Sequence, residues 1–524
     1  MADSDPISYF VISQPRRAIQ PERGSWLATA VRVPRQHRLF CAVLAVAAIV
    51  RVIVMLGYPP ALWFSDSLAY ISVALNGRHG PFEVRPVGYS FFLWTLRPFH
   101  AIALVTALQH AMGMATGTAI YALLRHRFRL RAWAATLASV PALLSAYAIQ
   151  IEHFVLSDTL FALLVTVATV LLLWRKDPPL WICALSGLIL AAAALDRSQG
   201  LALILPFVLY TATRVPRGRV LIGALAMCAI YAAPLLGYAW WFDQDNGSFQ
   251  LTTSTGAFLY SRVAAFANCS VIKPAADERW LCLSTPVGHR EYEAYYVWAS
   301  QSPIQHGPGP EFGAKVNRLA TDFALRAIEA QPSDYLRTVW NATMETFEPS
   351  QAAYADSLYV FPAKTPESVR ALAAANYSSY QVEYNYNSGD PDTRVAEPFA
   401  RWVRFYQRFI VLSPAMLSGI LLTGLIGMPF AWRRFGGPVV LPWLTGVAII
   451  VVGPATADYD SRYVIASIPM FCIAAALSLK EVGDFYANGT VEYPVGPGAP
   501  EDGTAAVTAG GGSGSAEDPL PRFQ

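Results

Sequence analysis

The chain has 524 residues, of which 54% are hydrophobic and only 14% are charged. In soluble domains about a quarter of all residues are charged, so this composition excludes an ordinary soluble protein. The formal net charge of +3, with its cations scattered along the chain, gives no indication of nucleic-acid binding.

Apolar residues are gathered in blocks about 18 to 22 residues long, the length that crosses the hydrocarbon core of a bilayer. The first block, 39–56, is followed by no small-residue cleavage site, so we predict an uncleaved anchor. Arg51 within it is predicted to extend outward to the membrane surface. Further spans are predicted at 101–124, 132–151, 155–174, 180–196, 199–213, 220–241, 407–430, 437–455 and 463–480. The predicted fold class is an all-α polytopic membrane protein with about ten transmembrane helices.

The segments 180–196 and 199–213 are short for two full crossings, so a re-entrant hairpin remains an alternative there.

Cationic residues gather in alternate connections between the predicted spans. They are Arg125, Arg127, Arg129, Arg131, Arg175, Lys176, Arg214, Arg217, Arg219, Arg433 and Arg434. By the positive-inside rule these connections and both termini are cytoplasmic, and the loops 57–100, 242–406 and 456–462 face outward.

This topology divides the chain into five parts. They are a cytoplasmic segment 1–38, a transmembrane module 39–241 with the outer loop 57–100, an external loop domain 242–406, C-terminal transmembrane helices 407–480, and a tail 481–524. The tail is rich in Gly, Pro, Ser, Asp and Glu, and we predict that it is disordered on the cytoplasmic side.

The external segment 242–406 is too long for a structureless connector, and helices are predicted at 312–330 and 333–347. Aromatic residues at 292–298 suit a membrane-interface belt, the commoner case, or stacking on sugars. Cys269 and Cys282 both lie in this segment. An external location permits a disulfide between them, and the sequence leaves the pairing open.

Polar residues that could carry chemistry cluster at the outer ends of the spans. Asp66 opens a stretch with Leu68, Ile71 and Leu75 at helical spacing, which suits a helix on the membrane surface. A carboxylate held there could take a proton from an incoming hydroxyl. An N-cap formed by Ser65 or Asp66 is the structural alternative. Arg78, His79 and Arg85 supply positive charge nearby. Contact with lipid headgroups would explain each of these cations equally well.

Three further polar groups are predicted at or near the outer surface. They are Glu152, His153 and Asp158; Asp196 and Arg197; and Asp458, Asp460 and Arg462. Helix capping by Ser157 and Asp158, or a solvated turn at 196–197, would explain the first two without a function. The sequence contains no HExxH, CxxC or GxxxxGK[ST] pattern, so it predicts no cofactor, indicates no metal site and argues against nucleotide hydrolysis.

Several of these segments together resemble the GT-C glycosyltransferases, which include protein O-mannosyltransferases and the lipid A aminoarabinose transferase. That superfamily has an acidic residue in the first outer loop, then an aromatic residue and a motif like RPPGYP. Here the matching positions are Asp66, Tyr70 and the segment RPVGYS at 85–90, which includes Tyr89.

Later segments also resemble motifs of the superfamily. LSDTLF at 156–161 resembles the family pattern LSEPLF, and LDRSQG at 195–200 resembles LTRPEG. The stretch 323–340 resembles an outer-loop helix, and Ser461-Arg462-Tyr463 resembles a late ArgTyr motif. Asp158 and Ser198 replace the family's Glu and Pro, and Ser67 follows Asp66 where many members have a second acid.

The resemblance implies a GT-C-like membrane architecture and transfer of a sugar from a polyprenyl phosphate to a glycan, lipid or protein acceptor on the outer face. Segment 39–241 would be the catalytic module. Asp66 would be the general base in a single inverting displacement, and Arg85, Arg197, Arg462 or His153 would stabilise the departing lipid phosphate. Tyr89 and Asp158 would join the substrate-binding residues.

The alternative function is that of a transporter or lipid flippase, which predicts charges along a midplane path and two similar halves. The sequence shows no convincing internal repeat and places its charges at the outer surface, which favours the enzyme.

Overall fold

A computed structural model describes residues 37–76, 84–214, 220–348, 360–376, 386–429 and 437–488. Within these ranges the backbone forms helices and no strand, with one isolated bridge between Leu62 and Phe154. Of the described residues, those up to Val482 form one compact unit and 483–488 belong to a second. The all-helical prediction is therefore confirmed for the described residues.

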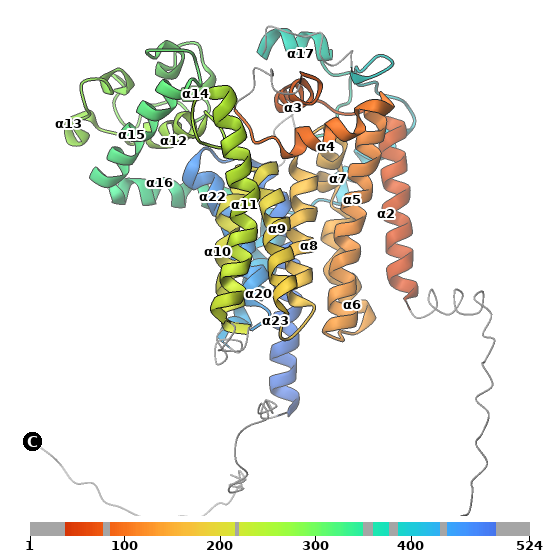
Figure 1. Ribbon diagram of the computed structural model, residues 1–524. Coiled ribbons are helices and arrows are strands. Elements are labelled where there is room, and N and C mark those ends of the chain that lie inside the picture. The colour runs from red at the N-terminus through yellow and green to blue at the C-terminus, as the bar shows by residue number, and fades with distance from the viewer. Residues whose placement is uncertain are drawn as a thin grey trace, which may run out of the picture. The chain divides into compact units, whose positions relative to one another are not determined.

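Apolar helices packed side by side form the larger core of the first unit (Figure 1). They are α2 (Arg38–Gly57), α5 (Ile102–Ala122), α6 (Ala132–Leu144), α8 (Asp158–Leu173), α9 (Leu180–Asp196), α10 (Ile204–Arg214), α11 (Val220–Asn246), α22 (Val440–Thr456) and α23 (Ile468–Asn488). Helix α9 contacts both α8 and α11, and α5 contacts α6 and α8. Large apolar side chains such as Leu221, Leu225 and Trp240 on α11 also point outward and are exposed. Helices that are apolar on every side are typical of a lipid environment.

Length and composition identify three described helices that could cross a bilayer, at Arg38–Gly57, Val220–Asn246 and Ser461–Tyr486. Two bent helix pairs raise this number to five, and four further apolar helices have 10–17 residues. The count of about ten spans stays a prediction. Helix α23 also continues to Asn488, past the predicted boundary at 480, and the tail after that residue lies outside the described ranges.

Two of the predicted spans are broken in the structure. The segment 132–151 forms α6 and α7 (Ala146–His153), which are bent by 47° around Ser145. The segment 407–430 forms the end of α19 (Phe399–Phe409) and α20 (Pro414–Ile426), bent by 53°. Proline lacks an amide hydrogen, so Pro141 weakens the last turns of α6. Pro414 favours a new helix start, which Ser413 caps by accepting from the Met416 amide. The apolar block 132–151 continues through its break, so hydrophobicity does not reveal that bend. At the second bend the two helices differ, because α19 carries Arg401, Arg404 and Arg408 and α20 is apolar.

The prediction that Arg51 extends outward is wrong. Its side chain is buried, and its guanidinium binds both oxygens of Glu152 at 2.8 and 2.7 Å. His110 Nδ1 lies 2.8 Å from Glu152 Oε2, and His110 Nε2 lies 3.1 Å from His153 Nδ1. Gly113 makes room for this group, because a Cβ there would collide with the Glu152 carboxylate. Four polar side chains thus satisfy one another between α2, α5 and α7.

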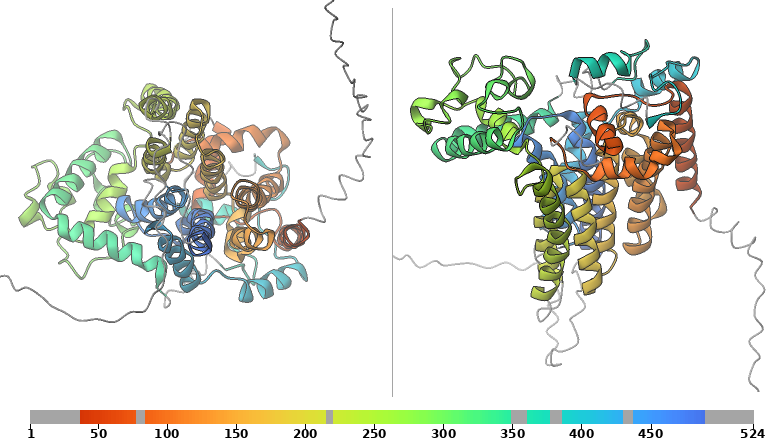
Figure 2. Two further views of the ribbon diagram at one scale, coloured as in Figure 1. Left: turned by 90° about the horizontal axis from the view of Figure 1, so that it is seen from below. Right: turned by 45° about the horizontal axis from the view of Figure 1, so that its top comes forward.

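The predicted external segment forms short helices with a core of their own (Figure 2). They are α12 (Thr255–Ala264), α13 (Cys269–Ile272), α14 (Tyr295–Trp298), α15 (Ala314–Ala330) and α16 (Pro332–Met344). A further helix of this segment, α17 (Val369–Asn376), contacts α3 (Ser65–Asn76) and lies outside that core. The two helices predicted at 312–330 and 333–347 correspond to α15 and to α16 with the 3-10 turn Glu345–Phe347. Val316, Ala320, Phe323 and Ala327 lie on one face of α15, which packs against α12.

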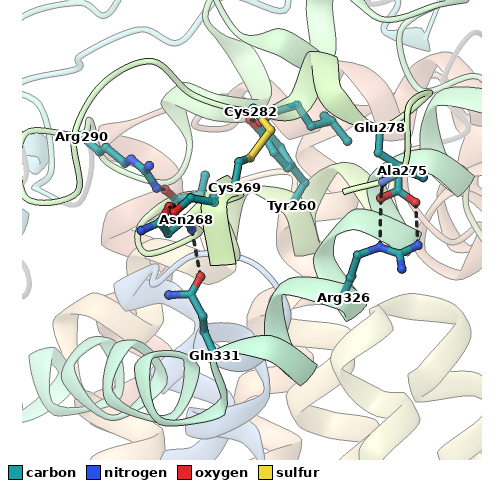
Figure 3. The surroundings of a disulfide bond; sticks show 12 residues. Tyr260, Asn268, Cys269, Ala275, Glu278, Cys282, Arg290, Arg326 and Gln331 are labelled. Atoms are coloured by element: carbon teal, nitrogen blue, oxygen red, sulfur yellow. Dashed lines mark hydrogen bonds and ion pairs between the residues drawn. A yellow bond between two sulfur atoms is a disulfide. The ribbon is translucent and has the colours of Figure 1, made fainter. Parts of the chain in front are cut away.

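Cys269 and Cys282 form a disulfide within this domain (Figure 3). On either side of it, Glu278 binds Arg326 of α15 at 3.1 Å, and the backbone amide of Asn268 donates to Gln331 Oε1 at 2.9 Å. The open question of pairing is therefore answered. Because disulfides persist in oxidising compartments, this bond agrees with the predicted external position of the segment.

Candidate active site

The first predicted outer loop contributes two short helices, α3 (Ser65–Asn76) and α4 (Gly88–Leu96). The helix predicted from Asp66 onward corresponds to α3, which begins one residue earlier at Ser65 and has Leu68 and Ile71 buried within the protein. The backbone of Leu62 pairs with the segment just before α8: its amide donates to the His153 carbonyl at 3.0 Å and its carbonyl accepts from Val155 at 3.3 Å. These bonds hold the start of α3 beside the start of α8.

Helix α4 begins where the chain passes very close to the end of α9. A Cβ at Gly88 would lie 2.6 Å from the backbone nitrogen of Asp196, so only glycine fits at this point of the RPVGYS segment. The Tyr89 hydroxyl donates to Gln109 Oε1 at 2.5 Å, and Gln109 Nε2 donates to the carbonyls of Glu152 and Phe154. The start of α4 is thus fixed against α5, α7 and α9.

Asp66 lies between two arginines that are distant in sequence. Its Oδ1 is 2.5 Å from Arg85 and its Oδ2 is 2.7 Å from Arg462. Arg462 also binds Asp460 at 2.8 Å and lies over the Phe64 ring. Asp66 and Arg462 are both buried, with exposures of 5% and 4%. The Asp66 carboxylate is therefore fully engaged with cations in this structure.

A second ion pair lies beside the first. Arg197 binds Asp158 at 2.5 Å, and its guanidinium is 4.9 Å from the centre of the Tyr463 ring. Ser157 Oγ lies 3.4 Å from Arg197 and 3.0 Å from the Tyr70 hydroxyl. Helix capping, the structural alternative for these two residues, is not seen. Ser157 occupies the N-cap position of α8 without a side-chain cap hydrogen bond, and the Asp158 carboxylate binds Arg197.

A cavity of about 290 Å³ opens next to these pairs. Arg85, Asp196 and Arg197 line its charged part, and Leu201, Leu251 and Val452 line an apolar part. Tyr70 and Tyr463 are also in its wall, whereas Asp66 and Arg462 lie one side chain behind it. Such a cavity suits a ligand with an anionic or polar head and an apolar tail.

The pKa of Asp66 reflects opposing effects. Burial raises it, but Arg85 and then Arg462 lower it by more in sum, so the pKa lies below its ordinary value. Asp66 is therefore ionised at neutral pH, which is the form that accepts a proton, although its two ion pairs weaken it as a base.

The structure brings together five of the seven predicted site residues: Asp66, Arg85, Asp158, Arg197 and Arg462. It does not bring His153 to the cavity, since this ring is fully buried between His110 and the Tyr58 carbonyl. Tyr89 is also fully buried and packs edge-on against Tyr70.

Two residues of the cavity wall, Asp196 and Tyr463, were named in the sequence but given no predicted role in the site. A solvated turn was the alternative for Asp196, although an acidic residue that ends an apolar helix was a usable signal. Tyr463 was part of the SerArgTyr motif, but its contacts with both Arg197 and Arg462 depend on tertiary structure. Within the described ranges, no group of three His, Cys, Asp or Glu side chains is arranged to hold a metal ion.

Asp458, in the short connection before Arg462, gives a pH-dependent prediction. Burial and the neighbouring Asp460 raise its pKa to about 6, against the opposing influence of Arg462 and Arg262. Between about pH 4 and 6, Asp458 therefore keeps a proton in the folded chain that it has released in the unfolded chain. The free energy of unfolding then falls as the pH rises through this range. The free energy of unfolding of Asp458→Asn should therefore exceed that of wild type by an amount that grows from pH 4 to 6 and then levels off. The difference should reach at most about 3 kcal/mol, since one pKa unit corresponds to about 1.4 kcal/mol. Denaturation in detergent measures it, and a difference that is the same at every pH would contradict this assignment.

The sequence matches no protein-family model and no curated protein sequence. Among solved structures, the chain is similar to the apo oligosaccharyltransferase of Archaeoglobus fulgidus, with 13% identity and a TM-score of 0.40 over 85% of this chain and 50% of that one. The same archaeal enzyme, AglB, in complex with an inhibitory peptide and dolichol phosphate gives 13% identity and a TM-score of 0.39 over 86% of this chain and 51% of that one. ArnT from Cupriavidus metallidurans, bound to undecaprenyl phosphate, gives 14% identity and a TM-score of 0.34, over 88% of this chain and 79% of that one. The chain thus spans about half the length of the archaeal enzyme, and similarity at this level carries no conclusion about activity.

Proposed function

We propose that this chain is a membrane glycosyltransferase of the GT-C type, which transfers a sugar from a polyprenyl-phosphate donor to a hydroxyl of a cell-envelope acceptor. The observation that carries this proposal is a group of three arginines paired with two buried carboxylates, Asp66 and Asp158, beside a cavity with charged and apolar parts. Arg85 and Arg197 line that cavity, and Arg462 joins them through Asp66. The order of the motifs along the sequence supports the same family.

The arginines match what a lipid-phosphate leaving group needs. When the bond between the anomeric carbon and the phosphate oxygen breaks, the polyprenyl phosphate takes both electrons and gains a negative charge. A guanidinium binds phosphate oxygens through two parallel hydrogen bonds and stays charged at any physiological pH. Fixed cations at the position where charge develops stabilise the transition state. The apolar residues of the cavity wall would contact the first units of the prenyl chain.

Asp66 would act as the general base. The acceptor oxygen attacks the anomeric carbon from the face opposite the phosphate, its proton passes to Asp66, and the configuration inverts in one displacement. Both oxygens of Asp66 are held by Arg85 and Arg462 in the structure. A bound phosphate would compete for the same guanidinium groups, and Asp66 would then become a stronger base. Donor binding would thereby prepare the acceptor step.

The other predicted site residues would act by positioning. Asp158 orients Arg197 through their ion pair, and Tyr89 supports the Tyr70 ring in the cavity wall. A transporter would require charges along a path through the middle of the membrane. The buried charges Arg51 and Glu152 bind each other, and neither lines the 290 Å³ cavity. This arrangement favours the transferase.

The proposal is tested with purified protein in lipid nanodiscs, supplied with radiolabelled polyprenyl-phosphate hexoses and an extract of envelope acceptors. Wild type should move label from the lipid to the acceptor fraction with at least one donor, with release of polyprenyl phosphate. A folded protein that transfers no label from glucosyl, mannosyl, galactosyl or aminoarabinosyl donors would contradict the proposal.

A further inference from the structure

Asp196 is the last residue of α9 and has an unusual environment. Its side chain is 1% exposed, yet neither carboxylate oxygen has a hydrogen-bond partner. The surrounding backbone is fixed, because the Arg197 amide donates to Ala193 and the Gly200 amide donates to Arg197, at 2.9 and 2.8 Å. The residue is thus held in place by its backbone, with no hydrogen bond to either carboxylate oxygen.

The nearest cation is engaged elsewhere. Arg197 follows Asp196 directly in the chain, but its guanidinium binds Asp158 and lies over Tyr463. The Tyr89 hydroxyl, on the other helix packed here, donates to Gln109. A buried and unpaired carboxylate is costly to the fold, and an apolar side chain would be tolerated better. Packing therefore gives no reason for an acid at this position, and a ligand gives one.

Asp196 lines the same cavity as Arg85 and Arg197. The neighbouring wall carries uncharged hydroxyl groups from Ser198, Thr252 and Thr255. A sugar joined to a phosphate needs its recognition groups directly beside the groups that hold the phosphate. Consecutive residues of the chain, Asp196 and Arg197, meet this condition.

We infer that Asp196 is a sugar-recognition residue, whose two oxygens accept hydrogen bonds from two neighbouring hydroxyls of the donor glycosyl unit. This inference rests on the proposed function and adds the part of the donor that selects the substrate. Two free acceptors on one carboxylate match the two donors of a vicinal diol. A site built around such bonds rejects sugars that lack the hydroxyls, because its own polar atoms are then left unpaired.

The test compares two probes on the same protein, polyprenyl phosphate and polyprenyl-phosphate hexoses with glucosyl, mannosyl or galactosyl heads. Asp196→Asn should bind polyprenyl phosphate as wild type does, and should bind the preferred hexosyl form about ten- to a hundredfold more weakly. Deoxy analogues that lack one hydroxyl of the diol should weaken binding to wild type by a similar factor, and should weaken binding to Asp196→Asn much less. Asp245→Asn, which changes an exposed acid at the end of α11, serves as the control and should bind both probes normally.

Stability separates recognition from a structural role. Since Asp196 has no partner, Asp196→Asn should unfold at the same or a higher temperature than wild type, whereas loss of a structural contact would lower that temperature. Equal affinity of the variant and wild type for the preferred hexosyl lipid would overturn the inference, and so would an equal loss for both probes. Failure of wild type to bind polyprenyl phosphate at all would instead reject the proposed function.

Discussion

Asp66→Asn is expected to transfer sugar about a hundred- to ten-thousandfold more slowly than wild type, the usual contribution of a general base. The amide keeps the shape of the side chain but cannot accept the acceptor's proton. Arg85 and Arg462 each lose a charged partner and stay available to a phosphate. The affinity for polyprenyl phosphate should therefore be kept or rise. Initial rates in nanodiscs under saturating donor measure the effect.

A matched control removes a different carboxylate from the same arginine. Asp460 binds Arg462 at 2.8 Å, so Asp460→Asn alters the local charge by the same amount and leaves Asp66 in place. This variant should lose less than tenfold in rate. Undiminished transfer by Asp66→Asn, or an equal loss in both variants, would rule out Asp66 as the base.

Glu152→Ala is expected to produce the largest loss of stability. The change leaves the Arg51 guanidinium buried between α2 and α7 with no carboxylate beside it. Removing one partner of a buried ion pair lowers the free energy of unfolding by about 3–5 kcal/mol. The double variant with Arg51→Met should recover much of this loss, because the stranded charge is then gone. Thermal unfolding in detergent measures both.

The exposed ion pair between Glu397 and Arg404 provides the comparison. Glu397→Gln should leave the unfolding temperature nearly unchanged, because exposed pairs contribute little. An equal and small effect of Glu152→Ala and Glu397→Gln would show that the buried network does not stabilise the fold.

Much of the site could be anticipated because the chemistry lies at helix ends. Hydrophobic blocks located those ends, and the cationic loops assigned Asp66, Asp158 and Arg462 to one face. Groups on one face of a compact bundle are candidates to meet, even when they are as far apart in sequence as Asp66 and Arg462. The structure joins these two in an ion pair.

Other features could not be derived from the pattern. Position along a helix does not say which way a side chain points around the helix axis, so His153 and Arg51 were expected toward the surface and are buried. The bends at Ser145 and before Pro414 depend on where the backbone leaves helical geometry, which the average hydrophobicity of a segment does not report. The lack of a partner for Asp196 is a property of the packed structure alone.

Binding of polyprenyl phosphate to the purified protein tests the central claim most directly, since the claim is that the arginines of the cavity hold a lipid phosphate. Wild type should bind this lipid, and Arg85→Gln and Arg197→Gln should each weaken binding about ten- to a hundredfold through loss of charge-assisted hydrogen bonds. Arg401→Gln, at a side chain that is 76% exposed, should bind as wild type does. If all three variants bind polyprenyl phosphate as wild type does, or if wild type does not bind it, the cavity is not a lipid-phosphate site.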